Sequence, residues 1–167
     1  MWRQCKAKKL FVAVPRALAL CPMLPVRFLT DSPHPAPAYQ TAHAAGMDVR
    51  AWLPDGSVTL GSLQRALIGT GLRVELPPGY EMQVRPRSGL AYQHGLTVLN
   101  SPGTIDADYR GEIKVLLVNL SADAAVIHDG DRIAQLVVAR HETVVWEAAP
   151  ALSETARGTG GYGSTGK

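Results

Sequence analysis

Apolar and polar residues alternate over short runs from residue 46 onward, and turn residues separate these runs. Alternation with a period of two, in stretches rich in Val, Ile and Leu, predicts β-strands. The predicted strands cover residues 47–53, 72–76, 80–87, 112–120, 132–140 and 143–147, preceded by a first strand within 23–29. Turns rich in Pro, Asp and Gly lie at 54–56, 77–79 and 128–131. This spacing predicts an all-β sandwich or barrel.

One short helix is predicted at residues 88–94, where a serine precedes a helix-compatible stretch. A second helix could form around residues 63–67, although nearby glycines would keep it short or abolish it. Trp52 and Trp146 fall in predicted strands, so we expect them to pack in the core or at a subunit interface.

The length of 167 residues suits one domain, which we place at residues 23–150. Residues 1–22 form a basic extension, either an organellar presequence or a non-native start ahead of Met23. We favour the second interpretation and expect a cytoplasmic protein. Residues 151–167 are a glycine-rich arm that cannot build a core of its own, and we expect it to close over a ligand as a flexible strap.

Charge and cysteine content exclude several functions for the body of the chain. Residues 1–22 hold five of the 17 basic residues and no acidic one, so the rest carries 12 bases against 14 acids. A body with a net charge of about −2 does not favour stable nucleic-acid binding. Both cysteines lie in the extension, which excludes disulfides and cysteine-ligated zinc elsewhere. No apolar run approaches the roughly 18 residues that a membrane span requires.

Five segments carry residues that suit one kind of chemistry: 45–48, 85–91, 100–111, 130–135 and 157–166. They supply donors for phosphate groups (Arg87, Ser88, Gln135, Arg157), carboxylates (Asp48, Asp106, Asp108) and two aromatic rings (Tyr109, Tyr162). The chain has no Walker-type phosphate loop, and its histidines show no metal-binding spacing. The pattern therefore predicts a nucleotide-phosphate site that uses arginine and backbone donors together with a hard divalent ion.

In this order, the five segments resemble the five motifs of the trimeric deoxyuridine triphosphatase (dUTPase) family. The resemblance extends from about residue 25 to the C-terminus and includes P-R-S-G-L-A, G-T-I-D-A-D-Y-R-G and G-D-R-I-A-Q. It implies an all-β jelly roll or distorted barrel, assembled as a homotrimer with shared active sites. It also implies hydrolysis of dUTP to dUMP and pyrophosphate, which limits uracil in DNA and supplies dUMP for thymidylate synthesis.

The resemblance also implies a role for each motif residue. Asp106 resembles the general base that activates the water attacking the α-phosphorus, and Asp48 the acid that contacts Mg²⁺ through water. Asn100 resembles the residue that reads the uracil edge, Tyr109 the ring under the deoxyribose, and Tyr162 the ring that stacks on uracil. The triphosphate contacts are matched by Arg87, Ser88, Gln135 and Arg157. The remaining substrate-binding positions are Gly89, Gly103, Thr104, Ile105, Lys114 and Gly163.

Two other functions are compatible with such a scaffold. A dCTP deaminase would need a glutamate acid/base at the ring, where this chain offers Asp106 and Tyr109. A non-catalytic nucleotide-binding protein would be expected to show a damaged motif. Among the neighbouring charged residues, we expect Asp108 to order its hairpin or pair with an arginine, and Arg110 and Arg132 to form structural ion pairs.

Overall fold

The computed structural model describes residues 23–161. Predictions that concern residues 1–22, Tyr162 and Gly163 therefore lie outside the described residues. The strands are β1 Arg27–Thr30, β2 Met47–Arg50, β3 Ser57–Leu60, β4 Arg65–Gly69, β5 Leu72–Glu75, β6 Tyr80–Arg85, β7 Leu96–Val98, β8 Gly103–Ile105, β9 Lys114–Asn119, β10 Ala125–His128 and β11 Arg132–Arg140. The helix α1 spans Ser88–His94.

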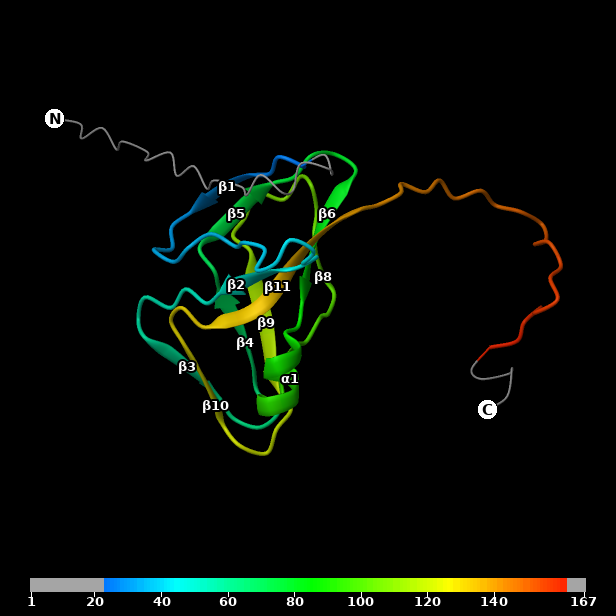
Figure 1. The fold of residues 1–167 in the computed structure, drawn as a ribbon. Helices are drawn as coiled ribbons and strands as arrows, with labels where there is room; N and C mark the ends of the chain where they lie inside the picture. Colours follow the sequence, from blue (N-terminus) through cyan, green and yellow to red (C-terminus); the bar gives the residue numbers. More distant parts are fainter. Residues whose placement is uncertain (1–22, 162–167) are drawn as a thin grey trace.

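Antiparallel pairing arranges the strands in four small sheets, with orders β1-β5, β10-β3, β2-β11-β6-β8 and β4-β9-β7. Figure 1 shows the strands wrapped around a common interior, with α1 at one end and the C-terminal segment leading away from the body. The all-β fold with one short helix is thus confirmed. None of the described helices is long and apolar enough to cross a bilayer.

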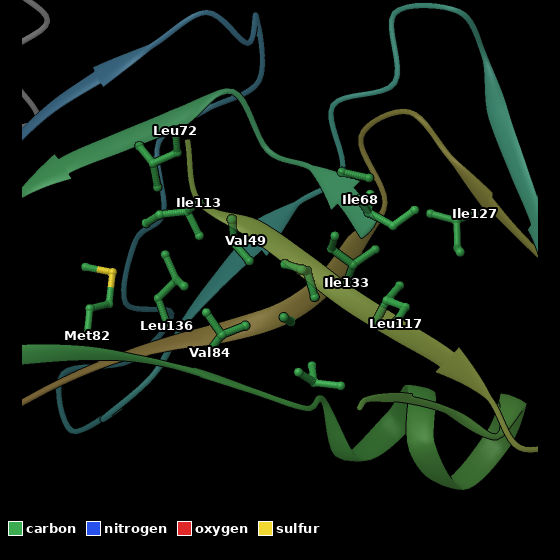
Figure 2. Packing of buried hydrophobic residues seen from close by; sticks show 14 of the residues in the cluster. Val49, Ile68, Leu72, Met82, Val84, Ile113, Leu117, Ile127, Ile133 and Leu136 are labelled. Atoms are coloured by element: carbon green, nitrogen blue, oxygen red, sulfur yellow. The ribbon is translucent and has the colours of Figure 1, made fainter. Parts of the chain in front are cut away.

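The core forms where the alternating apolar side chains of several sheets meet. In β9, Val115 and Leu117 are buried. Lys114 lies between the buried residues Ile113 and Val115 and faces outward, as the two-residue period of a strand requires. Side chains of β2, β6, β9 and β11 meet in one cluster (Figure 2). The buried amide of Asn119 is satisfied there, because its Nδ2 donates to the carbonyls of Leu60 and Asp123.

The helix lies where the sequence predicts it, but its start differs in detail. Arg87 occupies the N-cap with an extended backbone and no side-chain cap hydrogen bond, so Ser88 is already the first helical residue. Gly95 ends the helix in the left-handed conformation, with φ 64°. The serine hydroxyl is therefore not used to cap the helix.

No helix forms at residues 63–67, in line with the nearby glycines; β4 begins at Arg65 and pairs with β9, with Arg65 opposite Val118. One predicted strand is wrong. Residues 143–147 form no strand, because β11 ends at Arg140 and no strand of the described chain pairs with the segment beyond it. Trp146 is consequently 93% exposed and does not pack in this chain's core.

A loop contact ties residues 31–45 to the β10–β11 turn. Asp129 accepts a hydrogen bond from the backbone N–H of Leu53 at 2.7 Å and pairs with Nε2 of His34 at 2.9 Å. The backbone hydrogen bond from Leu53, followed by the His34 side chain, lowers the pKa of Asp129 below its ordinary value. Beneath the same loop is a cavity of about 20 Å³, which has room for one water molecule.

Replacing Asp129 by Asn should lower the melting midpoint at neutral pH. A carboxylate whose pKa is depressed by folding stabilises the protein above its unfolded pKa and loses this effect as the pH falls through the folded value. The difference between wild type and Asp129→Asn should therefore shrink as the pH falls below about 4. Melting curves recorded from neutral to acid pH test this. A difference that stays constant over the whole range would contradict it.

Candidate active site

Neighbouring strands of one sheet bring three of the sequence motifs together. In the register of β2, β11 and β6, Gln135 lies opposite Asp48 on one side and opposite Arg85 on the other. Arg87 lies two residues after the end of β6 and is the N-cap of α1. Segments separated by about 40 residues each in the sequence therefore meet at one end of this sheet.

Asp48 lies at the centre of this group with only 9% of its side chain exposed. Its Oδ1 accepts from Nε of Arg87 at 3.1 Å and from Nε2 of Gln135 at 3.3 Å, and its Oδ2 lies 3.1 Å from Nη1 of Arg132. We call these four residues the Asp48 cluster. Two guanidinium groups compensate one carboxylate, so the cluster carries a net positive charge next to the start of α1. Arg132 makes the ion pair that the sequence predicts.

The remaining donors of the second motif lie beside the cluster. Nη1 of Arg87 also donates to the carbonyl of Arg132 at 3.0 Å, so two nitrogen atoms of its guanidinium hold it in place. Ser88 and Gly89 are exposed in the first turn of α1. A fixed guanidinium, a free hydroxyl and exposed backbone N–H groups form a surface suited to an anion.

The third motif forms a separate hollow of about 300 Å³. It is lined by Leu67, Thr104, Ile105, Asp106, Tyr109, Glu112 and Lys114, and we call it the Asp106 hollow. Its volume is at the lower end of the range of small-molecule sites. Asp106 is exposed at the hollow and follows the last residue of β8.

Local contacts fix the turn that follows Asp106. The backbone N–H of Tyr109 donates to the carbonyl of Asp106 at 3.1 Å. The Tyr109 hydroxyl donates to the carbonyl of Glu112 at 2.9 Å, and its ring lies so close to Gly111 that a Cβ there would collide with it. Arg110 donates to the carbonyls of Ala107 and Tyr109. Its role is structural, but the predicted ion pair is wrong, because these acceptors are backbone oxygens.

Asn100 lies shortly before β8, and Gly103 is the first residue of that strand. Gly103 is buried opposite Val84, and a Cβ at this position would come within 3.2 Å of Nδ2 of Asn100. The amide of Asn100 therefore lies directly over the backbone of Gly103. A side chain and a backbone this close together could both contact the edge of a flat base.

Within one chain, the Asp48 cluster and the Asp106 hollow are far apart. Strand β6 runs antiparallel to β8, with Met82 opposite Ile105 and Val84 opposite Gly103. Asp106 therefore lies level with residue 81, whereas the Asp48 cluster lies level with residues 85–87. At about 3.3 Å per residue along a strand, together with the lateral offset, the separation is roughly 15–20 Å.

The C-terminal segment leaves the body of the protein after β11, past the Asp48 cluster and the Asp106 hollow. Nε of Arg140 donates to the Tyr80 hydroxyl at 2.9 Å, and its guanidinium lies 5.3 Å from the centre of the Tyr80 ring. Residues 142–159 are exposed, and Arg157 contacts only its own turn through the Gly160 carbonyl among the described residues. The segment that follows β11 leads away from the body of its own chain (Figure 1).

Sequence reasoning missed two residues of the Asp106 hollow, Leu67 and Glu112. Leu67 lies in a segment whose sequence could also form a short helix, so its pairing with β9 does not follow from the sequence. Glu112 is visible in the sequence as an acid between a glycine turn and a buried strand, but its partners depend on the fold. Among residues 23–161, no group of three or more His, Cys, Asp or Glu side chains could hold a metal ion by itself.

Comparison with known proteins places this geometry in context. Residues 32–166 match the family model described as dUTPase. The chain is 56% identical over 142 residues to deoxyuridine 5'-triphosphate nucleotidohydrolase of Cytophaga hutchinsonii, covering 85% of this chain and 92% of the relative. It is 57% identical over 136 residues to the protein of the same name from Roseobacter denitrificans, covering 81% and 90%.

Two solved structures share the fold at lower sequence identity. A Staphylococcus bacteriophage 80alpha dUTPase mutant with dUpNHpp has a TM-score of 0.77 at 23% identity, covering 86% of this chain and 99% of the phage protein. A mutant dUTPase from phage phi11 of S. aureus, described with a structural Mg(II) ion, has a TM-score of 0.69 at 21% identity, covering 78% and 99%. Together with the family match and the close relatives, these results show that the chain belongs to the dUTPase family.

Proposed function

We propose that this protein hydrolyses dUTP to dUMP and pyrophosphate, with Asp106 as the general base. The relatives at 56% and 57% identity carry the name of that activity. The observation that supports the mechanism is an exposed carboxylate at a hollow of about 300 Å³, which can accept a nucleoside. In such an enzyme, hydrolysis limits uracil in DNA and supplies dUMP for thymidylate synthesis.

Asp106 takes a proton from a water molecule that attacks the α-phosphorus, and pyrophosphate leaves on the opposite side. A carboxylate suits this role because it only has to accept a proton within hydrogen-bond reach. Its exposure leaves room for the water. Tyr109 lies under the deoxyribose, where a ribose 2′-hydroxyl would collide with the ring, and Thr104, Ile105 and Lys114 complete the contact. Asn100 and the backbone at Gly103 read the uracil edge.

Arg87 of the Asp48 cluster, Ser88 and Gly89 bind the triphosphate. Arg87 is held through Nε and Nη1, which leaves its Nη2 for a phosphate oxygen. Gln135 and Arg157 supply further donors, and Tyr162 and Gly163 complete the arm over the base. Catalysis then consists mainly of positioning and of charge stabilisation on the leaving pyrophosphate.

The residues present fit a Mg²⁺ ion that binds mainly to the triphosphate. Mg²⁺ retains several waters and needs only one or two carboxylates when phosphates supply the other ligands. Both oxygens of Asp48 already accept from arginine, so this carboxylate fits a contact through water better than direct ligation. When bound, the ion neutralises phosphate charge.

The separation within one chain supports a homotrimer with shared active sites. Asp106 must reach the α-phosphorus while the Asp48 cluster holds the same phosphate chain, yet the two lie roughly 15–20 Å apart in one subunit. A symmetric assembly solves this by placing the Asp106 hollow of one subunit against the Asp48 cluster of the next. The arm, residues 151–167, then closes over a site that neighbouring subunits form.

An assay of pyrophosphate release with dUTP, dCTP, dTTP and UTP tests the proposed function. We expect dUTP to be cleaved with a kcat/KM at least about 100-fold above each of the others, because unpaired polar groups on the base or sugar are strongly rejected. Ammonia release from dCTP would favour the deaminase instead. Binding of dUTP without pyrophosphate release would favour a non-catalytic nucleotide-binding protein.

A further inference from the structure

Glu112 joins the Asp106 hollow to the turn between β4 and β5. Its Oε1 accepts two backbone hydrogen bonds, from Thr70 at 3.0 Å and from Gly71 at 2.8 Å. Only 19% of the side chain is exposed. A Cβ at Gly69 would come within 2.8 Å of the same oxygen, so the backbone there leaves space for this carboxylate. The carboxylate is therefore fixed by the protein on one side.

Glu112 also contacts two residues that line the Asp106 hollow. Its backbone carbonyl accepts the hydroxyl of Tyr109 at 2.9 Å, and its Oε2 lies 3.6 Å from Nζ of Lys114. Tyr109 is 42% exposed and has a glycine rather than a side chain beneath its ring. Because the Tyr109 hydroxyl donates to the Glu112 carbonyl, the position of the ring depends on where the Glu112 backbone lies.

We infer that Glu112 is a positioning residue that sets sugar specificity by fixing Tyr109 and Lys114 at the floor of the hollow. This inference rests on the proposed function, because Tyr109 can reject ribose only if the hollow binds the nucleoside. The carboxylate anchors the Glu112 backbone to the β4–β5 turn, and the carbonyl then anchors the tyrosine. A ring that moves by about 1 Å would make room for a 2′-hydroxyl and lose discrimination.

The experiment compares kcat/KM for dUTP with kcat/KM for UTP in wild type, Glu112→Ala and Glu112→Gln. Ala removes the anchor, so the dUTP-to-UTP ratio should fall about tenfold or more. Gln keeps an oxygen that accepts from Thr70 and Gly71, so it should retain the ratio. It loses the charge beside Lys114 and should raise KM for dUTP about threefold at similar kcat. Glu75→Gln is the matched control, since it removes an ion-paired glutamate on β5, away from the hollow.

Tyr109→Phe keeps the ring but removes the hydroxyl that donates to Glu112, and it provides a second test if Glu112→Ala does not fold. We expect this variant also to lose dUTP-to-UTP discrimination. An unchanged ratio in folded Glu112→Ala, or in Tyr109→Phe, would overturn the inference.

Calorimetric binding of dUTP and UTP separates this inference from the proposed function. If the wild type binds dUTP but releases no pyrophosphate, the hydrolase proposal fails. The binding ratio in the same variants then still decides the role of Glu112, by the same expected loss in Glu112→Ala and retention in Glu112→Gln.

Discussion

Replacing Asp106 by Asn should reduce kcat for dUTP by about 10²–10⁴-fold, the usual contribution of a general base. Asn has nearly the same shape but cannot accept the proton from water at neutral pH. The side chain is exposed and its loss leaves no buried charge, so the fold should be unaffected. Steady-state kinetics by pyrophosphate release, with a melting curve for each protein, measure both effects.

Asp108→Asn is the matched control for this substitution. Asp108 is also exposed and lies two residues further along the same turn, but it does not line the hollow. We expect its kcat to stay within about twofold of wild type. Equal rates for wild type and Asp106→Asn would remove Asp106 from the base role, and a comparable loss in both variants would assign the effect to the turn as a whole.

Mixing two inactive variants should restore activity. Asp106→Asn damages the hollow and Arg87→Ala damages the Asp48 cluster, and each site of the proposed trimer takes one group from each of two subunits. In randomly mixed trimers, up to roughly a quarter of the sites then combine an intact hollow with an intact cluster. Activity should therefore rise from near zero to as much as about a quarter of wild type after joint unfolding and refolding.

Arg87→Ala is suited to this experiment because Asp48 keeps Arg132 and Gln135 as partners and is not left as an unpaired buried charge. The control is the same mixture without refolding, in which subunits have not exchanged. If refolded mixtures stay inactive while refolded wild type recovers, each site is built within one subunit. In that case the chain would have to rearrange so that the Asp106 hollow and the Asp48 cluster of one subunit come together.

Local sequence signals predicted the elements that depend on local chemistry. The helix spans residues 88–94 as the sequence predicts, and the apolar run of β9 is buried as its alternation indicates. Two segments show what local signals leave open. Residues 63–67 could form a short helix or none, and pairing with β9 decides for a strand. Residues 143–147 have the composition of a strand but find no pairing edge within the described chain.

The candidate site residues were predicted from the motifs and their resemblance to the dUTPase family, whereas the contacts between these residues could not be predicted. That Asp48 lies opposite Gln135 follows from the register between β2 and β11, which no local pattern encodes. The role inferred for Glu112 depends on a turn about 40 residues earlier in the sequence. Short motifs thus indicate candidate side chains, and only the fold shows which of them are in contact.

Because β6 lies between β11, next to the Asp48 cluster, and β8, next to the Asp106 hollow, its length sets the distance between these two groups and limits the insertions and deletions that the protein can accept. One added residue would turn every following side chain to the opposite face of the sheet. Two added residues would restore the faces but move Arg87 about 7 Å away from the level of Asp106. Natural variation in chain length should therefore collect in loops such as residues 31–45, while the six residues of β6 stay constant in number.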